Sequence, residues 1–380
     1  MNEQAAQPRG ENRRTLRAAF DPRNNSLNVL RLVFATAVIV SHAWPVGGFG
    51  PDPSFGGIAL GEWAVAGFFV ISGYLIAGSR LRSSLGAFLW RRFLRIFPGL
   101  WACLLVTVVV FVSLASLHEG GALTSQLGAR VSYAFNNAFL LPDITHRNWG
   151  VAGTLGSVPY SGVWNGSLWT LLYELGCYVA LAALLSFAAL RKRSTLVVAF
   201  VYVATLHLLD VEITALPWQR IELAVNLATY FLAGALLYAY QERIPLRSSL
   251  AALATAVLVA ASLTGHASAV AALPVAYICL WLGVVLPLRG VGRKNDLSYG
   301  VYIYAFPVAQ LLALYGAHGL GVWKFVLLSV ALTYPLAAAS WFVVERPALG
   351  LKNRRLPLLR APSPQRAQPA ARMRPAEEDD

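Results

Sequence analysis

Two ionisable side chains interrupt an apolar stretch near the start of the chain. The segment LRLVFATAVIVSHAWP, residues 30–45, carries Arg31 near one end and His42 near the other. Eleven helical residues make about three full turns, so both side chains lie on one face of a helix, about 16 Å apart along its axis. A neutral imidazole can act as a general base, and a guanidinium binds carboxylates or phosphates. Two interpretations are open: a functional helix face, or charged groups at the two interfacial ends of a membrane-spanning helix.

A second basic group follows in the segment LWRRFLRIFPGLW, residues 89–101. The spacing of Arg92 and Arg95 places both on the same side of a predicted short interfacial helix. Two arginines on one side suit bidentate recognition of a phosphate. A cluster of basic residues on the cytoplasmic side of a membrane would explain them without any ligand.

An acidic residue interrupts the apolar segment SLWTLLYELGCY, residues 167–178. Glu174 lies well inside a predicted membrane-spanning helix, and an acidic residue in such a place should face a partner or a cavity. It could keep Nδ1 of His42 protonated and Nε2 basic, as in a carboxylate–histidine pair. A structural pair with a group on another helix explains Glu174 equally well. Among the six histidines, His42 is the best candidate for a general base. The other five lie in loops or at loop edges or, for His207, lack an accompanying motif: His118, His146, His207, His266 and His318.

The composition predicts the elements that must position these groups. Of 380 residues, 57% are hydrophobic and 13% are charged, against about 25% charged residues in a soluble domain. The chain is therefore predicted to be an all-α, polytopic integral membrane protein. A bilayer core needs roughly 20 apolar residues per helix, and this criterion gives about ten transmembrane helices, at residues 27–44, 60–78, 98–117, 167–190, 196–209, 221–240, 250–263, 270–288, 297–315 and 322–344.

Basic residues gather in alternate connections. They are frequent before the first predicted span and in the second, fourth, sixth and eighth connections, and sparse in the others. The positive-inside rule therefore predicts that both termini are cytoplasmic. The formal net charge of +13 then lies mostly on the cytoplasmic face, where it attracts anionic lipid and anionic ligands. Because this charge is dispersed among loops, nucleic acid is not an expected partner.

Three regions follow from this pattern. Residues 1–26 form a basic cytoplasmic segment, residues 27–347 the membrane domain, and residues 348–380 a cytoplasmic tail that is predicted to be disordered. The first span has no small-residue cleavage site after it, so we expect it to remain in the protein. Small residues in GFFVISGYLIAG, residues 67–78, predict a close helix contact. The cysteines show no paired spacing, and neither a disulfide framework nor a metal site is expected.

These motifs together resemble the membrane acyltransferase-3 family, the O-acyltransferases of bacterial surface polysaccharides and some antibiotics. The resemblance rests on Arg31 and His42, and on segments that occur in the same order along residues 31–347: FFVISGYL (68–75), RRFLRIFP (91–98), SLWTLLYELGCY (167–178), LSYGVYIYAFPV (297–308) and WFVVERP (341–347). Their ordered set is more specific than any single segment.

The resemblance implies transfer of an acyl group, usually acetyl, to a hydroxyl of a surface glycan or lipid-linked saccharide in the bacterial inner membrane. The donor would be cytosolic acyl-coenzyme A, bound as a substrate, and no tightly bound cofactor is expected. The resemblance implies that His42 is the general base and that acyl-coenzyme A is bound by three arginines, Arg31, Arg92 and Arg95. Glu174 is the second catalytic candidate, as the residue that orients His42.

This chain departs from the family pattern at two points. Many members carry a histidine where this sequence has Ala305, so we expect no catalytic acid or base there. Some members also carry a C-terminal esterase-like domain, which we do not expect in this chain.

The main alternative is a transporter or exporter of a lipid-linked glycan, which would share the ten helices and the internal charges. A structural membrane anchor is the third class, although it requires no ordered set of Arg, His and Glu. Consumption of acyl-coenzyme A with release of free thiol separates an acyltransferase from both. The acyl group and the acceptor depend on the shape of the pocket, which a sequence does not give.

Overall fold

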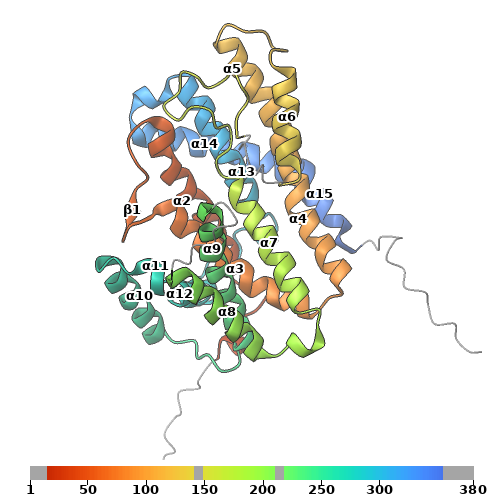
Figure 1. Ribbon diagram of the computed structural model, residues 1–380, viewed down its shortest axis with the longest axis vertical. Helices are drawn as coiled ribbons and strands as arrows, with labels where there is room; N and C mark the ends of the chain where they lie inside the picture. Colours follow the sequence, from red (N-terminus) through yellow and green to blue (C-terminus); the bar gives the residue numbers. More distant parts are fainter. Residues whose placement is uncertain (1–14, 141–148, 210–217, 354–380) are drawn as a thin grey trace, which may run out of the picture.

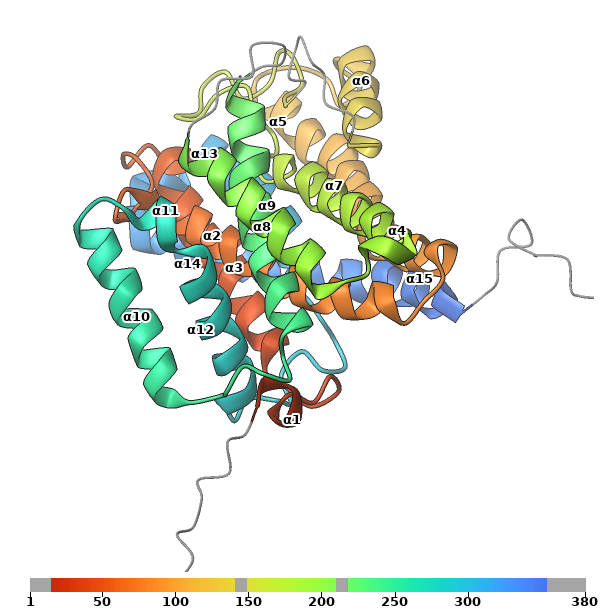
Figure 2. The same ribbon diagram turned by 60° about the horizontal axis from the view of Figure 1, so that its bottom comes forward.

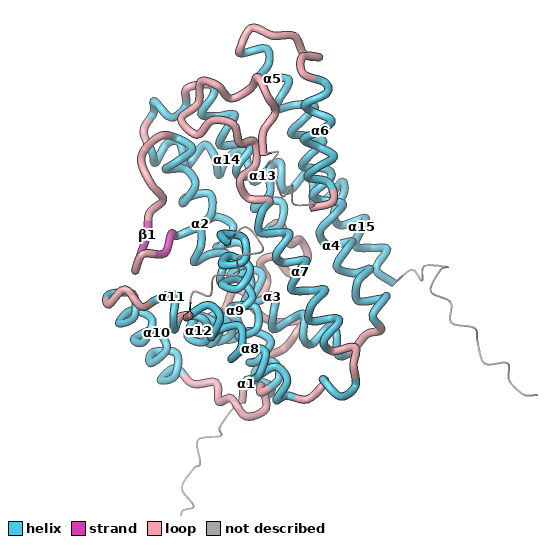
Figure 3. The backbone as a smooth tube through the Cα atoms, viewed as in Figure 1, coloured by secondary structure: helices cyan, strands magenta, loops and turns pink. Residues whose placement is uncertain are grey.

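The computed structural model describes residues 15–140, 149–209 and 218–353, and their regular secondary structure is almost entirely helical (Figures 1 and 3). The sheet within them is one antiparallel pair, β1 (Ser54–Phe55) and β2 (Ile58–Ala59). The α-helices are α1 (Leu16–Ala19), α2 (Leu27–Gly47), α3 (Leu60–Leu81), α4 (Leu85–Val106), α5 (Val112–His118), α6 (Leu127–Ala138), α7 (Trp169–Leu184), α8 (Arg193–Leu208), α9 (Trp218–Ala239), α10 (Ser248–Leu263), α11 (Ala267–Val270), α12 (Ala272–Val285), α13 (Ser298–Leu314), α14 (Val322–Ser340) and α15 (Arg346–Gly350). Two π-helical turns, η1 (Thr107–Phe111) and η4 (Trp341–Glu345), continue α4 and α14, and short 3₁₀ turns are η2 (Ala188–Leu190), η3 (Ala317–Leu320) and η5 (Leu351–Asn353).

The predicted all-α fold class is confirmed for the described residues, and each of the ten predicted spans overlaps a helix there. Among the described residues, 5 helical stretches are long and apolar enough to cross a membrane: Leu27–Gly47, Leu60–Leu81, Leu85–His118, Ile221–Ala239 and Val322–Asn353. The other five spans fall on apolar helices of 10–17 residues, namely α7, α8, α10, α12 and α13. At about 1.5 Å per residue, these are shorter than a bilayer core of about 30 Å.

The prediction of a separate short helix before a third span that starts at residue 98 is wrong. The hydroxyl of Ser84 caps one continuous helix, α4, by accepting a hydrogen bond from the amide of Ala87 at 3.4 Å. That helix includes all three arginines of the RRFLRIFP segment, Arg91, Arg92 and Arg95, and passes through Pro98 without a break. The arginines therefore belong to the first half of a long apolar helix that can face its neighbours in the bundle.

The centre of the bundle is formed by α2, α3, α9 and α13. The contact between α3 and α9 is especially close, because a methyl group on Gly73 would overlap the carbonyl oxygen of Phe231. A methyl on Gly234 would likewise overlap the carbonyl oxygen of Val70. The predicted close helix contact is thus confirmed, and glycine is required on both sides of it.

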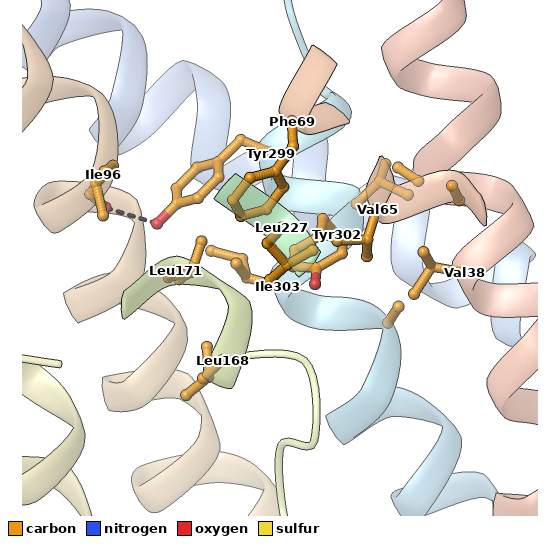
Figure 4. Close-up of a cluster of buried hydrophobic side chains, with 14 of the residues drawn as sticks. Val38, Val65, Phe69, Ile96, Leu168, Leu171, Leu227, Tyr299, Tyr302 and Ile303 are labelled. Carbon is orange, nitrogen blue, oxygen red and sulfur yellow. Dashed lines mark hydrogen bonds between the residues drawn. The ribbon is translucent and has the colours of Figure 1, made fainter. Parts of the chain in front are cut away.

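Aromatic and branched side chains fill the space between α2, α3, α4 and α13 (Figure 4). Tyr302 and Ile303 of α13 lie in the same cluster as Val65 and Phe69 of α3. The hydroxyl of Tyr299 donates a hydrogen bond to the carbonyl of Ile96 at 2.7 Å, which fixes α13 against α4. This packing holds the start of α13 beside the arginines of α4.

The connection between α5 and α7 is folded rather than extended. Arg130 of α6 is buried and donates hydrogen bonds to the carbonyl of Val108 at 3.0 Å and to the hydroxyl of Ser113 at 2.7 Å. Val108 lies in the π-helical turn, where the helical hydrogen-bond pattern is interrupted. Further along, Gln310 of α13 donates to the carbonyls of Tyr160 and Val163 at 2.7 and 2.6 Å, so this connection is attached to α13.

Both ends of the described chain pack onto the bundle. The amide of Leu16 donates to the carbonyl of Ile244 at 2.8 Å, and the Leu16 side chain is buried. At the other end, helical structure continues to Asn353, beside α4 (Figure 1). The predicted boundary between residues 347 and 348 therefore falls within a helical stretch. The rest of the predicted tail lies outside the described residues. On the opposite periphery, α10 lies beside α12 (Figure 2).

Candidate active site

Arg31 and Arg95 meet at one carboxylate. Nη1 of Arg31, from α2, lies 2.5 Å from Oδ2 of Asp296, and Nη2 of Arg95, from α4, lies 2.6 Å from the same oxygen. The side chains of all three are 15–21% exposed. Two residues predicted to bind the donor are thus brought together from separate helices, with an acidic residue between them.

Asp296 is fixed by the start of α13. Its Oδ1 accepts hydrogen bonds from the hydroxyl of Ser298 at 2.6 Å and from the amide of Ser298 at 3.2 Å. Burial raises the pKa of Asp296, but the charges of Arg31 and Arg95 outweigh burial and hold this pKa well below its usual range. The carboxylate is therefore ionised, and both of its oxygens are hydrogen-bonded.

Arg92 lies next to this cluster but takes part in a different set of contacts. Its guanidinium lies 5.9 Å from the ring centre of Phe88 and 5.8 Å from that of Tyr178. Its Nε is buried and has no hydrogen-bond partner. Arg92 is therefore held mainly by aromatic faces, and a donor group of this guanidinium is unused.

Glu174 contacts α3 and its own helix. Oε1 accepts a hydrogen bond from the hydroxyl of Ser72 at 3.0 Å and a short one from the hydroxyl of Tyr178. Tyr178 also faces Arg92, so Glu174 belongs to the surroundings of the arginines. The structure gives no contact between Glu174 and His42.

The carboxylate beside His42 belongs to Asp52 in the connection between α2 and β1. Nδ1 of His42 lies 3.6 Å from Oδ1 of Asp52, which is longer than a hydrogen bond. That oxygen accepts a hydrogen bond from the hydroxyl of Ser41 at 2.5 Å, and Ser41 accepts one from the amide of Gly61 at 2.9 Å. Burial raises the pKa of Asp52, but the neighbouring His42 and Ser41 outweigh it and leave this pKa below its ordinary value.

The other side of His42 faces α13. The ring of Phe306 meets the imidazole edge to face, with ring centres 5.4 Å apart. Phe306 directly follows Ala305, which is buried, so this helix packs an aromatic ring against the imidazole and supplies no titratable group there. The side chain of His42 is 27% exposed.

Two polar centres therefore lie along α2, which contributes at least one residue to each. The first, which we call the arginine centre, comprises Arg31, Arg92, Arg95 and Asp296. The second, the histidine centre, comprises His42 and its two neighbours Ser41 and Asp52. Arg31 and His42 are about 16 Å apart along the helix axis, so the two centres lie at different places.

Sequence reasoning missed Asp52 and Asp296. Asp296 is an acidic residue in a connection whose other charges are basic, and it directly precedes the LSYG segment. These two features could have identified Asp296 as a candidate site residue from the sequence. Asp52 lies in a short loop with proline and glycine neighbours, and nothing in that loop's pattern distinguishes it.

The described part of the chain is thus a helical bundle with 5 stretches long and apolar enough to cross a membrane. It carries a cluster of arginines around a carboxylate and, separately, a histidine beside a second carboxylate. Residues 24–342 match the acyltransferase-3 family, described as an acyltransferase domain, and the chain belongs to this family. It is therefore a member of a family of enzymes that transfer acyl groups.

Two relatives are similar over nearly their whole length. An O-acetyl transferase of Shigella phage Sf6 is 29% identical over 351 residues, which cover 88% of this chain and 99% of the relative. Nodulation protein 10 of Rhizobium leguminosarum bv. viciae is 30% identical over 374 residues, which cover 87% of this chain and 94% of the relative. No solved structure matches this chain.

Proposed function

We propose that this protein transfers an acyl group, most simply acetyl, from acyl-coenzyme A to a hydroxyl of a surface glycan or glycolipid. Family membership supports acyl transfer, and the similarity to an O-acetyl transferase supports a hydroxyl acceptor. The observation that carries the proposal is the pair of centres on α2, because a phosphate-bearing donor and a proton-accepting base require two such groups.

The arginine centre would hold the phosphates of coenzyme A. Arginine is suited to this role because its planar guanidinium is always charged and can bind phosphate through two parallel hydrogen bonds. Arg31, Arg92 and Arg95 supply three such groups from α2 and α4. The thioester lies at the far end of the long pantetheine arm, so the phosphates and the reacting carbonyl need separate sites.

His42 would accept the proton of the acceptor hydroxyl. As that oxygen attacks the thioester carbonyl, Nε2 takes the proton, and collapse of the tetrahedral intermediate releases the coenzyme A thiolate. The proton then neutralises this thiolate. We propose direct transfer, because Cys103 and Cys279 are buried and Cys177 is half-buried within an apolar helix, so none of the three has the setting of an activated nucleophile.

Asp52 takes the orienting role that the sequence suggested for Glu174. Its carboxylate faces Nδ1, which would keep that nitrogen protonated and Nε2 basic. Contacts of this kind are often long without substrate and shorten in the Michaelis complex. Glu174, beside Tyr178 and Arg92, would support the donor end instead.

We further propose ten crossings of a bacterial inner membrane, with both termini in the cytoplasm. The alternation of basic connections supports this arrangement, and the shorter apolar helices would cross where the bundle surrounds them. The arginine centre then opens to the cytoplasm, where acyl-coenzyme A is made. The histidine centre lies toward the outer face, where a surface glycan arrives.

The test is mass analysis of surface glycans from cells that express the wild type, His42→Ala, or Arg92→Ala with Arg95→Ala, at equal membrane levels. We expect an acyl-sized mass increment with the wild type and its loss in both variants. An unchanged acylation pattern in both variants would contradict the proposal, and transport of a glycan would then become the better account.

A further inference from the structure

Asp296 forms ion pairs with two of the arginines that the proposed donor site needs. One oxygen, Oδ2, accepts from both Arg31 and Arg95, at 2.5 and 2.6 Å. A phosphate that approaches these guanidinium groups therefore meets a negative charge of the protein itself. At the few ångströms that separate such groups, like charges repel strongly in a partly buried site.

The groups around Asp296 are those that a phosphate group uses. They are two guanidinium groups and the Ser298 amide at the start of the 17-residue helix α13. The Ser298 hydroxyl holds Oδ1 of Asp296 in place. Helix N-termini and arginine pairs are recurrent phosphate sites, because both offer N–H donors to a negative group. The carboxylate of Asp296 thus stands where an oxygen of a phosphate would be bound.

The geometry allows a phosphate to displace the Asp296 carboxylate from the arginines. It lies in the coil before α13, its side chain is 15% exposed, and the side chains of Arg31 and Arg95 are 21% and 16% exposed. Each arginine gives a single terminal nitrogen to the carboxylate. The neighbouring Arg92 has a buried Nε without any hydrogen-bond partner, so one more donor beside the site is unused.

We propose that Asp296 is a built-in competitor of the donor phosphates, which gives up Arg31, Arg95 or both when phosphate binds. This inference rests on the proposed function. Without the carboxylate, two partly buried guanidinium groups would lose their hydrogen-bonded ion pairs in the free protein, which is costly. With it, the arginines stay in place, and release of coenzyme A after transfer is made easier. Asp296 is in this account a positioning residue that sets donor affinity.

The experiment compares coenzyme A binding by the full-length protein in detergent, measured by calorimetry at fixed ionic strength. Asp296→Asn removes the competing charge and should bind coenzyme A at least about tenfold more tightly, a change equivalent to about 1.4 kcal/mol. Ser298→Ala keeps both ion pairs but removes one hydrogen bond that holds Oδ1, so it should shift affinity in the same direction by a smaller factor. Asp21→Asn, an exposed site with the same charge change, should bind as the wild type does.

Weaker or unchanged binding in both Asp296→Asn and Ser298→Ala would overturn the inference, because Asp296 would then support the site rather than compete for it. Thermal melting with and without coenzyme A checks the fold of each variant. If Asp296→Asn is poorly folded without ligand, Ser298→Ala decides the outcome. A wild type that neither binds coenzyme A nor releases thiol from acetyl-coenzyme A would instead contradict the proposed function itself.

Discussion

The carboxylate that faces His42 comes from the loop that follows its own helix, only ten residues along the chain. Asp52 is shared between His42 and the hydroxyl of Ser41, so its position is set by two neighbours. Glu174, on α7, is occupied by Ser72 and Tyr178 instead. The two acidic residues should therefore affect different steps of the reaction.

Asp52→Asn should lower kcat about tenfold or more with little change in the KM for acyl-coenzyme A. The amide cannot hold the imidazole in the required tautomer as the carboxylate does. Glu174→Gln should instead raise the KM for acyl-coenzyme A, because Glu174 and Tyr178 lie beside Arg92. Steady-state assays of thiol release measure both effects. The reverse pattern, with kcat lost in Glu174→Gln and kept in Asp52→Asn, would contradict the assignment.

The Arg31–Asp296–Arg95 cluster should persist in mildly acidic solution. The pKa of Asp296 is lower in the folded protein than in an unfolded chain, where it is about 3.9. The stabilisation is thus complete above the unfolded value and is lost as the pH falls toward the lower, folded value. The difference in melting temperature between the wild type and Asp296→Asn should be constant from about pH 7 to 5 and shrink below about pH 4. A difference that disappears between pH 7 and 5 would contradict the ionised cluster.

Sequence reasoning identified the arginines and the histidine, since charged groups in apolar segments are conspicuous. It could not find their partners. Asp296 is separated from Arg31 by 265 positions and from Arg95 by 201, and no local periodicity connects them. The packing of α13 against α2 and α4 creates this contact, and only the fold contains that information.

At the scale of elements, apolar length located the helices, and the small residues of α3 located its close contact with α9. The limits of α4 were missed, because the basic residues at 91–95 resemble a loop boundary. Aromatic neighbours and a capping serine allow the helix to continue through them. The sequence predicts that α3 makes a close contact, but it does not predict that the partner is α9, because α2 and α13 are also apolar helices.

Gly73→Ala should destabilise the protein, by about 1–3 kcal/mol or more, because the added methyl overlaps a backbone oxygen that cannot move independently. Gly176→Ala is the matched control. Gly176 lies within α7 with open space around it, and alanine favours a helix by up to about 1 kcal/mol relative to glycine. Melting temperatures in detergent compare the two variants. Equal stability of both would contradict the close packing of α3 on α9.

At the scale of the whole molecule, the proposed topology separates the ends of α2 across a membrane. Ser54→Cys, in the first connection, should react with an impermeant thiol reagent added to intact cells. Lys192→Cys, in the fourth connection, should react only after the membrane is opened. Both positions are exposed, whereas Cys103 and Cys279 are buried and Cys177 is half-buried, so the wild type is the control for background labelling. Labelling of both positions from the same side would contradict ten crossings.

The most direct test of acyl transfer is release of free thiol from acetyl-coenzyme A by the purified protein, in the presence of a lipid-linked glycan fraction. We expect glycan-dependent thiol release by the wild type and a loss of at least about 100-fold in His42→Ala, since a general base typically contributes a factor of 10²–10⁴. Coenzyme A binding should remain in that variant, because His42 is distant from the arginine centre. Thiol release that does not require the glycan, or that proceeds at the wild-type rate in His42→Ala, would contradict the assignment of His42 as the base of an acyltransferase.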